Sequence, residues 1–210
     1  MDIKVKCLSW EQIRLIADDF REQHVKPSDL LPVDMEMILE IELKIDIDLK
    51  ENLLALADID AFISPDCRTM FVDKNQYEDR RYLNRLRFTY AHEVGHIVLH
   101  KEEMSKIRFS SIEEWIQFQT NRANDGYIWF ERQANEFAGR LLIPKPRLLQ
   151  EIKNYDSKIK QYLSRVENDC YELDSLKMVI ARAVCPVFGV SEKVLYRRIV
   201  NEKIFEEIGY

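Results

Sequence analysis

Residues 87–100 read RFTYAHEVGHIVLH, and they contain three of the four histidines in this 210-residue chain. The apolar spacing of the stretch predicts a helix. His92 and His96 are four residues apart, so both imidazoles lie on one helix face and can reach the same ion. Glu93 lies about 100° around the helix from His92, where it can reach a water molecule held by that ion. This HExxH pattern is typical of zinc-dependent hydrolytic sites.

Zinc is the metal that this pattern favours. A catalytic zinc site uses three protein ligands and leaves the fourth tetrahedral position to water, whose pKa falls to about 7. Glu93 would take the proton of that water as general base while the water attacks a carbonyl. We therefore expect one Zn²⁺ ion on His92 and His96, with other divalent metals as alternatives and no further cofactor. The competing interpretation is a pair of helical histidines without a metal.

A third ligand must come from another segment, and residues 129–144, WFERQANEFAGRLLIP, are the best candidate. Glu131 and Asn135 share one narrow helix face with two alanines, which permit close approach of another helix. We assign Glu131 as the third metal ligand and Asn135 as a residue that supports the ligands. Two alternatives remain at this point. Glu136, about 140° around the helix, could replace Glu131, or Glu131 could be an exposed residue without a role.

Three further residues near the motifs are candidates for supporting roles. His100 extends the histidine face, but its ring would lie roughly 12 Å along the helix axis from that of His92. We therefore expect His100 to support the ligands or cap the helix rather than bind the ion. Tyr90 and Tyr127 are close to the two motifs, but such tyrosines usually serve in packing. The sequence assigns no residue that stabilises an oxyanion.

The periodicity of apolar residues predicts an α+β fold, with a small sheet followed by helices. Alternation over residues 41–49 predicts a strand. Residues 61–63 and 69–72 predict a hairpin around Ser64-Pro65-Asp66, which gives an antiparallel or mixed sheet of about three strands. Helices are expected over residues 10–20, 35–39, 79–101, 112–119, 128–143, 147–153, 158–167, 173–184 and 192–204.

The composition favours one domain, or one domain with a small appendage. Apolar residues make up 46% of the chain and charged residues 32%, which is enough for a sizeable core. The net charge of −6 disfavours a general nucleic-acid binder. No uncharged apolar run approaches the ~20 residues of a membrane span. The first residues lack the apolar stretch of a secretory signal, and the four cysteines form no CxxC pair, so we expect a cytoplasmic protein.

The two motifs together resemble the ImmA/IrrE family of metallo-endopeptidases. Residues 87–100 match the pattern RFTxAHExGHxxxH, and residues 131–144 match ExxAnxFAxxLLxP. Weaker similarity reaches upstream to residues 32–34 and downstream to residues 190–198. The resemblance therefore covers roughly residues 30–204, and its two central motifs are specific.

The resemblance implies a zincin-like metallopeptidase. In such a protein His92, His96 and Glu131 hold the metal, and Glu93 is the general base. Characterised members cleave a helix-turn-helix repressor that is often encoded beside them on mobile elements. By analogy we expect a repressor on a separate chain as the protein substrate, with no direct contact to nucleic acid or membrane.

We divide the chain into a zincin-like peptidase domain, residues 1–150, and a C-terminal helical segment that packs on it, residues 151–210. Residues 101–128 separate the two motifs and could cover the site, dock a partner or pack in the core.

One alternative function is a metal-containing antagonist that binds a repressor stoichiometrically without cleaving it. Another is DNA binding through the turn and helix at 187–204, where Lys193, Arg197, Arg198 and Lys203 lie.

Overall fold

The computed structural model describes residues 6–27, 30–106, 114, 125–165 and 170–210. Within them, three strands form one mixed sheet in the order β1-β3-β2. Strand β1 (Asp46–Lys50) runs parallel to β3 (Thr69–Asp73), and β2 (Ala61–Ile63) runs antiparallel to β3. The small mixed sheet and the helices around it confirm the predicted α+β class. The helix predicted over residues 112–119 lies almost wholly outside the described residues.

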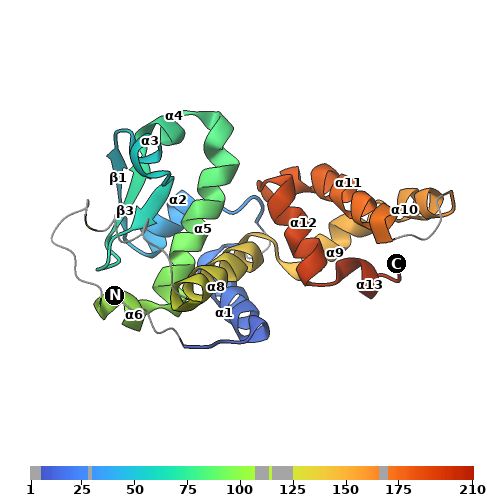
Figure 1. Cartoon of the computed structure of the whole chain (residues 1–210), viewed down its shortest axis with the longest axis horizontal. Coiled ribbons are helices and arrows are strands. Elements are labelled where there is room, and N and C mark those ends of the chain that lie inside the picture. The colour runs from blue at the N-terminus through green and yellow to red at the C-terminus, as the bar shows by residue number, and fades with distance from the viewer. Residues whose placement is uncertain (1–5, 28–29, 107–113, 115–124, 166–169) are drawn as a thin grey trace.

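Most of the described chain is helical (Figure 1). The helices are α1 (Trp10–His24), α2 (Met35–Met37), the π-helix η1 (Ile38–Glu42), α3 (Leu53–Ala57), α4 (Lys74–Glu78), the 3₁₀-helix η2 (Arg80–Tyr82), α5 (Leu83–Leu99), α6 (Lys101–Lys106), α8 (Asp125–Leu142), α9 (Lys145–Lys153), α10 (Asp156–Leu163), α11 (Cys170–Phe188), α12 (Glu192–Asn201) and α13 (Ile204–Glu207).

The strand predicted over residues 41–49 is wrong in its first half. The helical turns of α2 and η1 continue to Glu42, and Lys44 then adopts a left-handed conformation with φ of 55°. Ile41, which the alternation placed on a buried face, is 66% exposed. The helical spacing of Met35, Ile38 and Leu39, which are all buried, decides the local structure instead. Pairing with β3 begins only at residue 46.

Helix α8 is the centre of the fold, because it packs on α5 along one side and on α1 along another (Figure 1). Helix α1 begins with a capping box formed by Ser9 and Gln12. The contact with α5 is close, since a Cβ on Gly95 would lie 3.1 Å from the Cα of Ala134. The two helices that carry the sequence motifs are therefore held together at their backbones.

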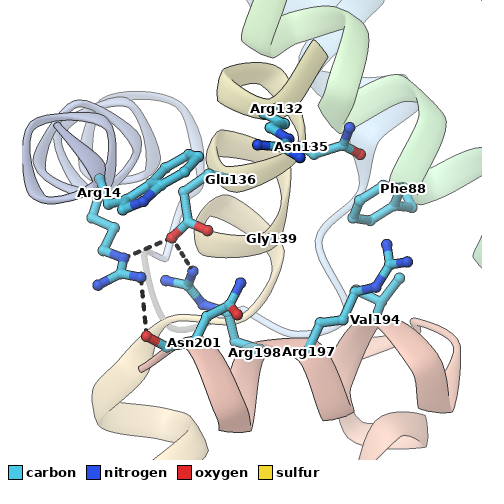
Figure 2. A pocket seen from close by; sticks show the side chains of 11 residues that line it. Arg14, Phe88, Arg132, Asn135, Glu136, Gly139, Val194, Arg197, Arg198 and Asn201 are labelled. Atoms are coloured by element: carbon cyan, nitrogen blue, oxygen red, sulfur yellow. Dashed lines mark hydrogen bonds and ion pairs between the residues drawn. The ribbon is translucent and has the colours of Figure 1, made fainter. Parts of the chain in front are cut away.

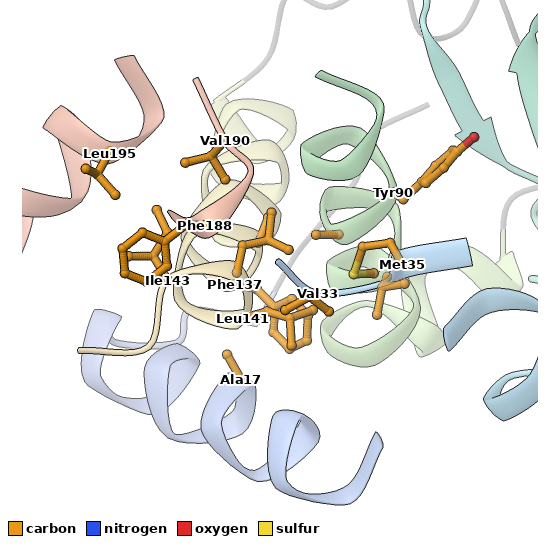
Figure 3. Close-up of a cluster of buried hydrophobic side chains, with 14 of the residues drawn as sticks. Ala17, Val33, Met35, Tyr90, Phe137, Leu141, Ile143, Phe188, Val190 and Leu195 are labelled. Carbon is orange, nitrogen blue, oxygen red and sulfur yellow. The ribbon is translucent and has the colours of Figure 1, made fainter. Parts of the chain in front are cut away.

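The C-terminal helices pack against this centre through a continuous apolar core. Figure 3 shows Phe188 and Val190 between Leu195 of α12 and Phe137 of α8, and all four are buried. Arg87, the first residue of the histidine motif, adds a polar link. Its Nη1 donates to the carbonyl of Gly189 at 2.7 Å, and its Nε donates to the carbonyl of Val33 at 3.0 Å.

Candidate metal centre

The histidine motif lies in the second half of α5, with His96 buried and His92 half-buried. Both rings face α8, because Gly95 lets Ala134 approach closely enough to bring Glu131 opposite them. The long helix therefore supplies the two imidazoles, and the neighbouring helix supplies the carboxylate. The three side chains meet at one point, although Glu131 lies 39 residues after His92 in the sequence.

The spacing of the candidate ligand atoms suits one small ion. The Nε2 atoms of His92 and His96 lie 3.0 Å apart. The carboxylate oxygens of Glu131 lie 3.2 Å from His92 Nε2 and 3.5 Å from His96 Nε2. Ligand atoms at ~2.05 Å from a tetrahedral zinc ion would lie about 3.3 Å from one another. Within the described part of the chain, this is the group of histidine, cysteine and acidic side chains that could hold a metal.

The electrostatics of the group favour an ionised Glu131. Burial opposes its charge, but hydrogen bonds to His92 and His96 lower the pKa of this carboxyl well below its usual range. Burial likewise opposes a charge on His92, yet its hydrogen bond to Glu131 raises the pKa of the imidazole. Among the described residues, no lysine or arginine forms an ion pair with Glu131. The carboxylate and the two imidazoles therefore form a donor set without a permanent cation.

Glu93 lies on the sheet side of α5, and it is 6% exposed. Its Oε2 accepts a hydrogen bond of 3.0 Å from the backbone N–H of Ile63, at the end of strand β2. Burial raises the pKa of Glu93, although the nearby His96 and His92 oppose that shift. The strand thus fixes the carboxylate beside the histidines. No sequence pattern indicates this contact, because it depends on where the strand meets the helix.

His100 ends α5 and contacts His96, as its predicted supporting role requires. The Nδ1 atoms of the two rings lie 3.0 Å apart, and His100 Nε2 lies 3.3 Å from Oε1 of Gln133. Phe130 stacks on both rings, with centroid distances of 4.2 Å. Burial lowers the pKa of His100 to about 3, so the ring is neutral and can orient His96. Sequence reasoning missed Gln133 and Phe130, although both lie next to Glu131 on α8.

The other candidates take different positions. Asn135 is exposed, and its side chain donates to the backbone carbonyl of Glu131 at 2.8 Å while also contacting His92. The hydroxyl of Tyr127 donates to Oε1 of Glu131 at 2.5 Å. Tyr90 is buried away from the histidines, in a cavity that Glu36 also lines. The sequence favours packing roles for both tyrosines, but the hydroxyl of Tyr127 contacts the proposed ligand Glu131.

The alternative ligand Glu136 lies away from the histidines. Its Oε1 accepts hydrogen bonds from Nε of Arg14 at 2.6 Å and from Nη1 of Arg198 at 2.7 Å. Arg198 is 3% exposed, so it cannot contribute to the exposed basic patch that sequence reasoning placed on the last helices. Lys193 and Arg197 of that patch are exposed.

Comparison with known proteins finds one matching family model. The family model of the IrrE N-terminal-like domain, peptidase M78, matches residues 44–200. No curated protein matches the sequence. A solved structure of a Mycobacterium tuberculosis transcriptional regulator aligns at 13% identity with a TM-score of 0.44, covering 92% of this chain and 52% of that one. The chain therefore spans about half the length of that regulator.

Within the described residues, no helix combines the length and the apolar character that a membrane crossing requires.

The family match covers 157 of 210 residues, counted from residue 44 to residue 200, and includes both motifs. The resemblance drawn from those motifs is thereby confirmed, and the chain belongs to the IrrE N-terminal-like family of metallopeptidases.

Proposed function

We propose that this protein is a zinc-dependent endopeptidase. The observation that carries the proposal is the convergence of His92, His96 and Glu131 within ligand distance of one another, with Glu93 buried beside them. Membership of a metallopeptidase family supports the same reaction class. We assign His92, His96 and Glu131 as metal ligands and Glu93 as general base.

The donor set fits zinc better than a harder cation. Two imidazole nitrogens and one carboxylate oxygen are borderline ligands, whereas calcium and magnesium favour all-oxygen sites. A bound zinc ion would polarise the scissile carbonyl and lower the pKa of a water molecule to about 7. Three protein ligands leave room for that water and for the substrate.

The protein's own groups then move the proton and hold the geometry. Glu93 accepts a proton from the attacking water and passes it to the leaving amine. The N–H of Ile63 holds one oxygen of Glu93, which leaves the other oxygen free for this transfer. His100 and Tyr127 fix the orientation of His96 and Glu131 through the contacts described above.

The first test is the peptidase activity itself. Purified protein with one equivalent of Zn²⁺ would be incubated with a proteome-derived peptide mixture, and new termini would be identified by mass spectrometry. Glu93→Gln should retain the metal and lose at least about a hundredfold in cleavage rate, because general-base catalysis contributes 10²–10⁴-fold. Glu78→Gln, at an exposed position on α4, is the matched control. Undiminished cleavage by Glu93→Gln would refute the assigned base.

We further propose that the substrate is a helix-turn-helix repressor on a separate chain in the cytoplasm. The support is the resemblance of the two motifs to repressor-cleaving peptidases. Co-expression with candidate repressors from the same genome tests it: repressor fragments should form with the wild type and not with Glu93→Gln. Relief of repression at one-to-one stoichiometry, with the repressor intact, would favour the non-catalytic antagonist instead.

A further inference from the structure

A pocket of about 520 Å³ opens between α1, α5, α8 and α12, and four arginines line it. Figure 2 shows it from close by, with Arg14 and Arg198 at one side, Arg132 on α8 above and Arg197 rising from α12 toward Phe88. We call it the arginine pocket. Its concentration of positive charge contrasts with the net charge of −6 of the whole chain.

Two of the four arginines belong to a closed network of ion pairs. Arg14 and Arg198 both contact Glu136, and Arg198 also pairs with Glu202. Glu202 in turn contacts Arg140, whose guanidinium binds Asp18 through two bonds of 2.6 Å. The network therefore contains three arginines and three carboxylates. It is neutral as a unit.

The other two arginines of the pocket have no acidic partner among the described residues. Arg132 and Arg197 are exposed, and within the described part of the chain neither side chain has a hydrogen bond or an ion pair. Both line the pocket, together with the apolar side chains of Trp10, Phe88 and Val194. The pocket thus offers two free guanidinium groups beside an apolar wall, an arrangement that suits a short aliphatic stem ending in a carboxylate.

The arginine pocket borders the candidate metal centre. Asn135 lines the pocket and contacts His92, and Phe88 lies on α5 one turn before His92. Four residues of helix correspond to about 6 Å, and an extended peptide advances by roughly 3.3–3.6 Å per residue. A peptide whose scissile bond lies at the metal ligands would therefore bring a side chain about two residues away to the pocket.

We propose that the arginine pocket binds an acidic side chain of the substrate, so that the enzyme selects peptide bonds close to an aspartate or glutamate. This inference rests on the proposed peptidase function and adds a specificity determinant to it. Arg132 and Arg197 bind the carboxylate. The apolar side chains of Trp10, Phe88 and Val194 in the pocket and the net charge of −6 of the whole chain favour a single acidic side chain over a continuous polyanion such as DNA.

Binding can be measured without any cleavage. A fluorescein-labelled peptide of six residues, with one glutamate flanked by alanines and an amidated C-terminus, would be titrated with the full chain and followed by fluorescence anisotropy, with one equivalent of Zn²⁺ and again after chelation. We expect binding in both states and at least tenfold weaker binding by Arg132→Glu/Arg197→Glu. The matched control is Arg80→Glu/Arg165→Glu, which changes the net charge equally at exposed positions outside the pocket. The control should bind within twofold of the wild type.

Several results would overturn the inference. They are the absence of binding by the wild type, equal loss in the control variant, and binding only with Zn²⁺, which would mean that the peptide carboxylate binds the metal. Tighter binding of a labelled 20-base-pair DNA duplex at the same arginines would identify a nucleic-acid site instead. Peptide binding without any proteolysis would refute the proposed peptidase but keep the acidic specificity of the pocket.

Among the cleaved peptides, the wild type should enrich aspartate and glutamate on one side of the scissile bond. Arg132→Glu/Arg197→Glu should lose this enrichment at least fivefold while still cleaving other peptides, because neither residue is a metal ligand or the base. Cleavage that persists with the same acidic preference in this variant would refute the inference and leave the peptidase proposal intact.

Discussion

Two carboxylates on helix α8, Glu131 and Glu136, are five residues apart and have opposite surroundings. Glu131 faces two imidazoles at 3.2 and 3.5 Å, and no arginine or lysine among the described residues pairs with it. Glu136 faces two guanidinium groups at 2.6 and 2.7 Å. One helix therefore presents a carboxylate without a permanent cation on one face and a fully paired carboxylate on another.

The surroundings of the two carboxylates distinguish a buried charge with a structural role from one that can bind a metal ion. Arginine is always protonated, so the network around Glu136 carries its own counter-charges and holds α1, α8 and α12 together. Imidazole is neutral or charged according to its surroundings. Glu131 faces imidazoles and no lysine or arginine among the described residues, so its site lacks a permanent counter-charge that a divalent cation would supply. A balanced cluster indicates a structural role, and an unbalanced cluster indicates a binding site.

The largest effect on stability is expected from Glu136→Gln. Its loss leaves Arg14 and the buried Arg198 without their shared partner, and breaking a buried ion pair costs about 3–5 kcal/mol. Urea unfolding of the metal-free protein would measure the change in free energy. Glu131→Gln under the same conditions should lose clearly less, because no lysine or arginine among the described residues pairs with Glu131 and would be left without its partner. Equal losses for both variants would contradict the distinction between the two carboxylates.

The next largest effect is on zinc affinity. Here we expect Glu131→Gln to be the more damaging variant, whereas Glu136→Gln is the more damaging one for stability. Glu131→Gln should weaken Zn²⁺ binding by more than about a hundredfold, since even residues that only orient ligands contribute 10–100-fold. Glu136→Gln, where it remains folded, should keep the wild-type affinity. Competition with a chromophoric chelator and elemental analysis would measure both. Unchanged zinc content in Glu131→Gln would rule out Glu131 as the third ligand.

Sequence reasoning succeeded where the information was local to one helix. The spacing of His92 and His96 and the face that carries Glu131 follow from 3.6 residues per turn, and the structure brings these three side chains together. The same helix geometry places Glu136 about 140° around the helix from Glu131. It could not show which of the two faces would meet the histidines, because that depends on how α8 docks on α5.

The contacts that sequence reasoning missed are non-local. The hydrogen bond from Ile63 to Glu93 depends on the position of β2, and Gln133 reaches His100 only because α5 and α8 are adjacent. The sequence places Arg198 in a basic segment, yet its partners are Glu136 on α8 and Glu202, the residue that caps α12. The π-helical turn at Ile38–Glu42 was also missed, because an alternating pattern and a helical pattern overlap there.

The smallest expected effects on stability and zinc binding come from two glycine-to-alanine substitutions. Gly95 lies where α5 meets the face of α8 that carries Glu131, and Gly139 lies beside the ion-pair network of Glu136. In Gly95→Ala the new Cβ would lie 3.1 Å from the Cα and the carbonyl oxygen of Ala134, so α5 and α8 must separate by a few tenths of an ångström. Because overpacking costs 1–3 kcal/mol and the gain in helix propensity returns about 1, we expect a net loss on the order of 1 kcal/mol. Zinc binding should weaken as well, since Ala134 and Glu131 are one turn apart on the helix that moves.

Gly139→Ala is the matched control on the side of the ion-pair network. Its Cβ would meet only Cδ of Arg198, at an ordinary contact distance of 3.8 Å. The helix propensity gain of about 0.5–1 kcal/mol should therefore appear as a small stabilisation, with unchanged zinc affinity. Urea unfolding and chelator competition on both variants would measure the contrast. If Gly95→Ala behaved like Gly139→Ala, the close approach of α5 to α8 would not be what positions Glu131 opposite the histidines.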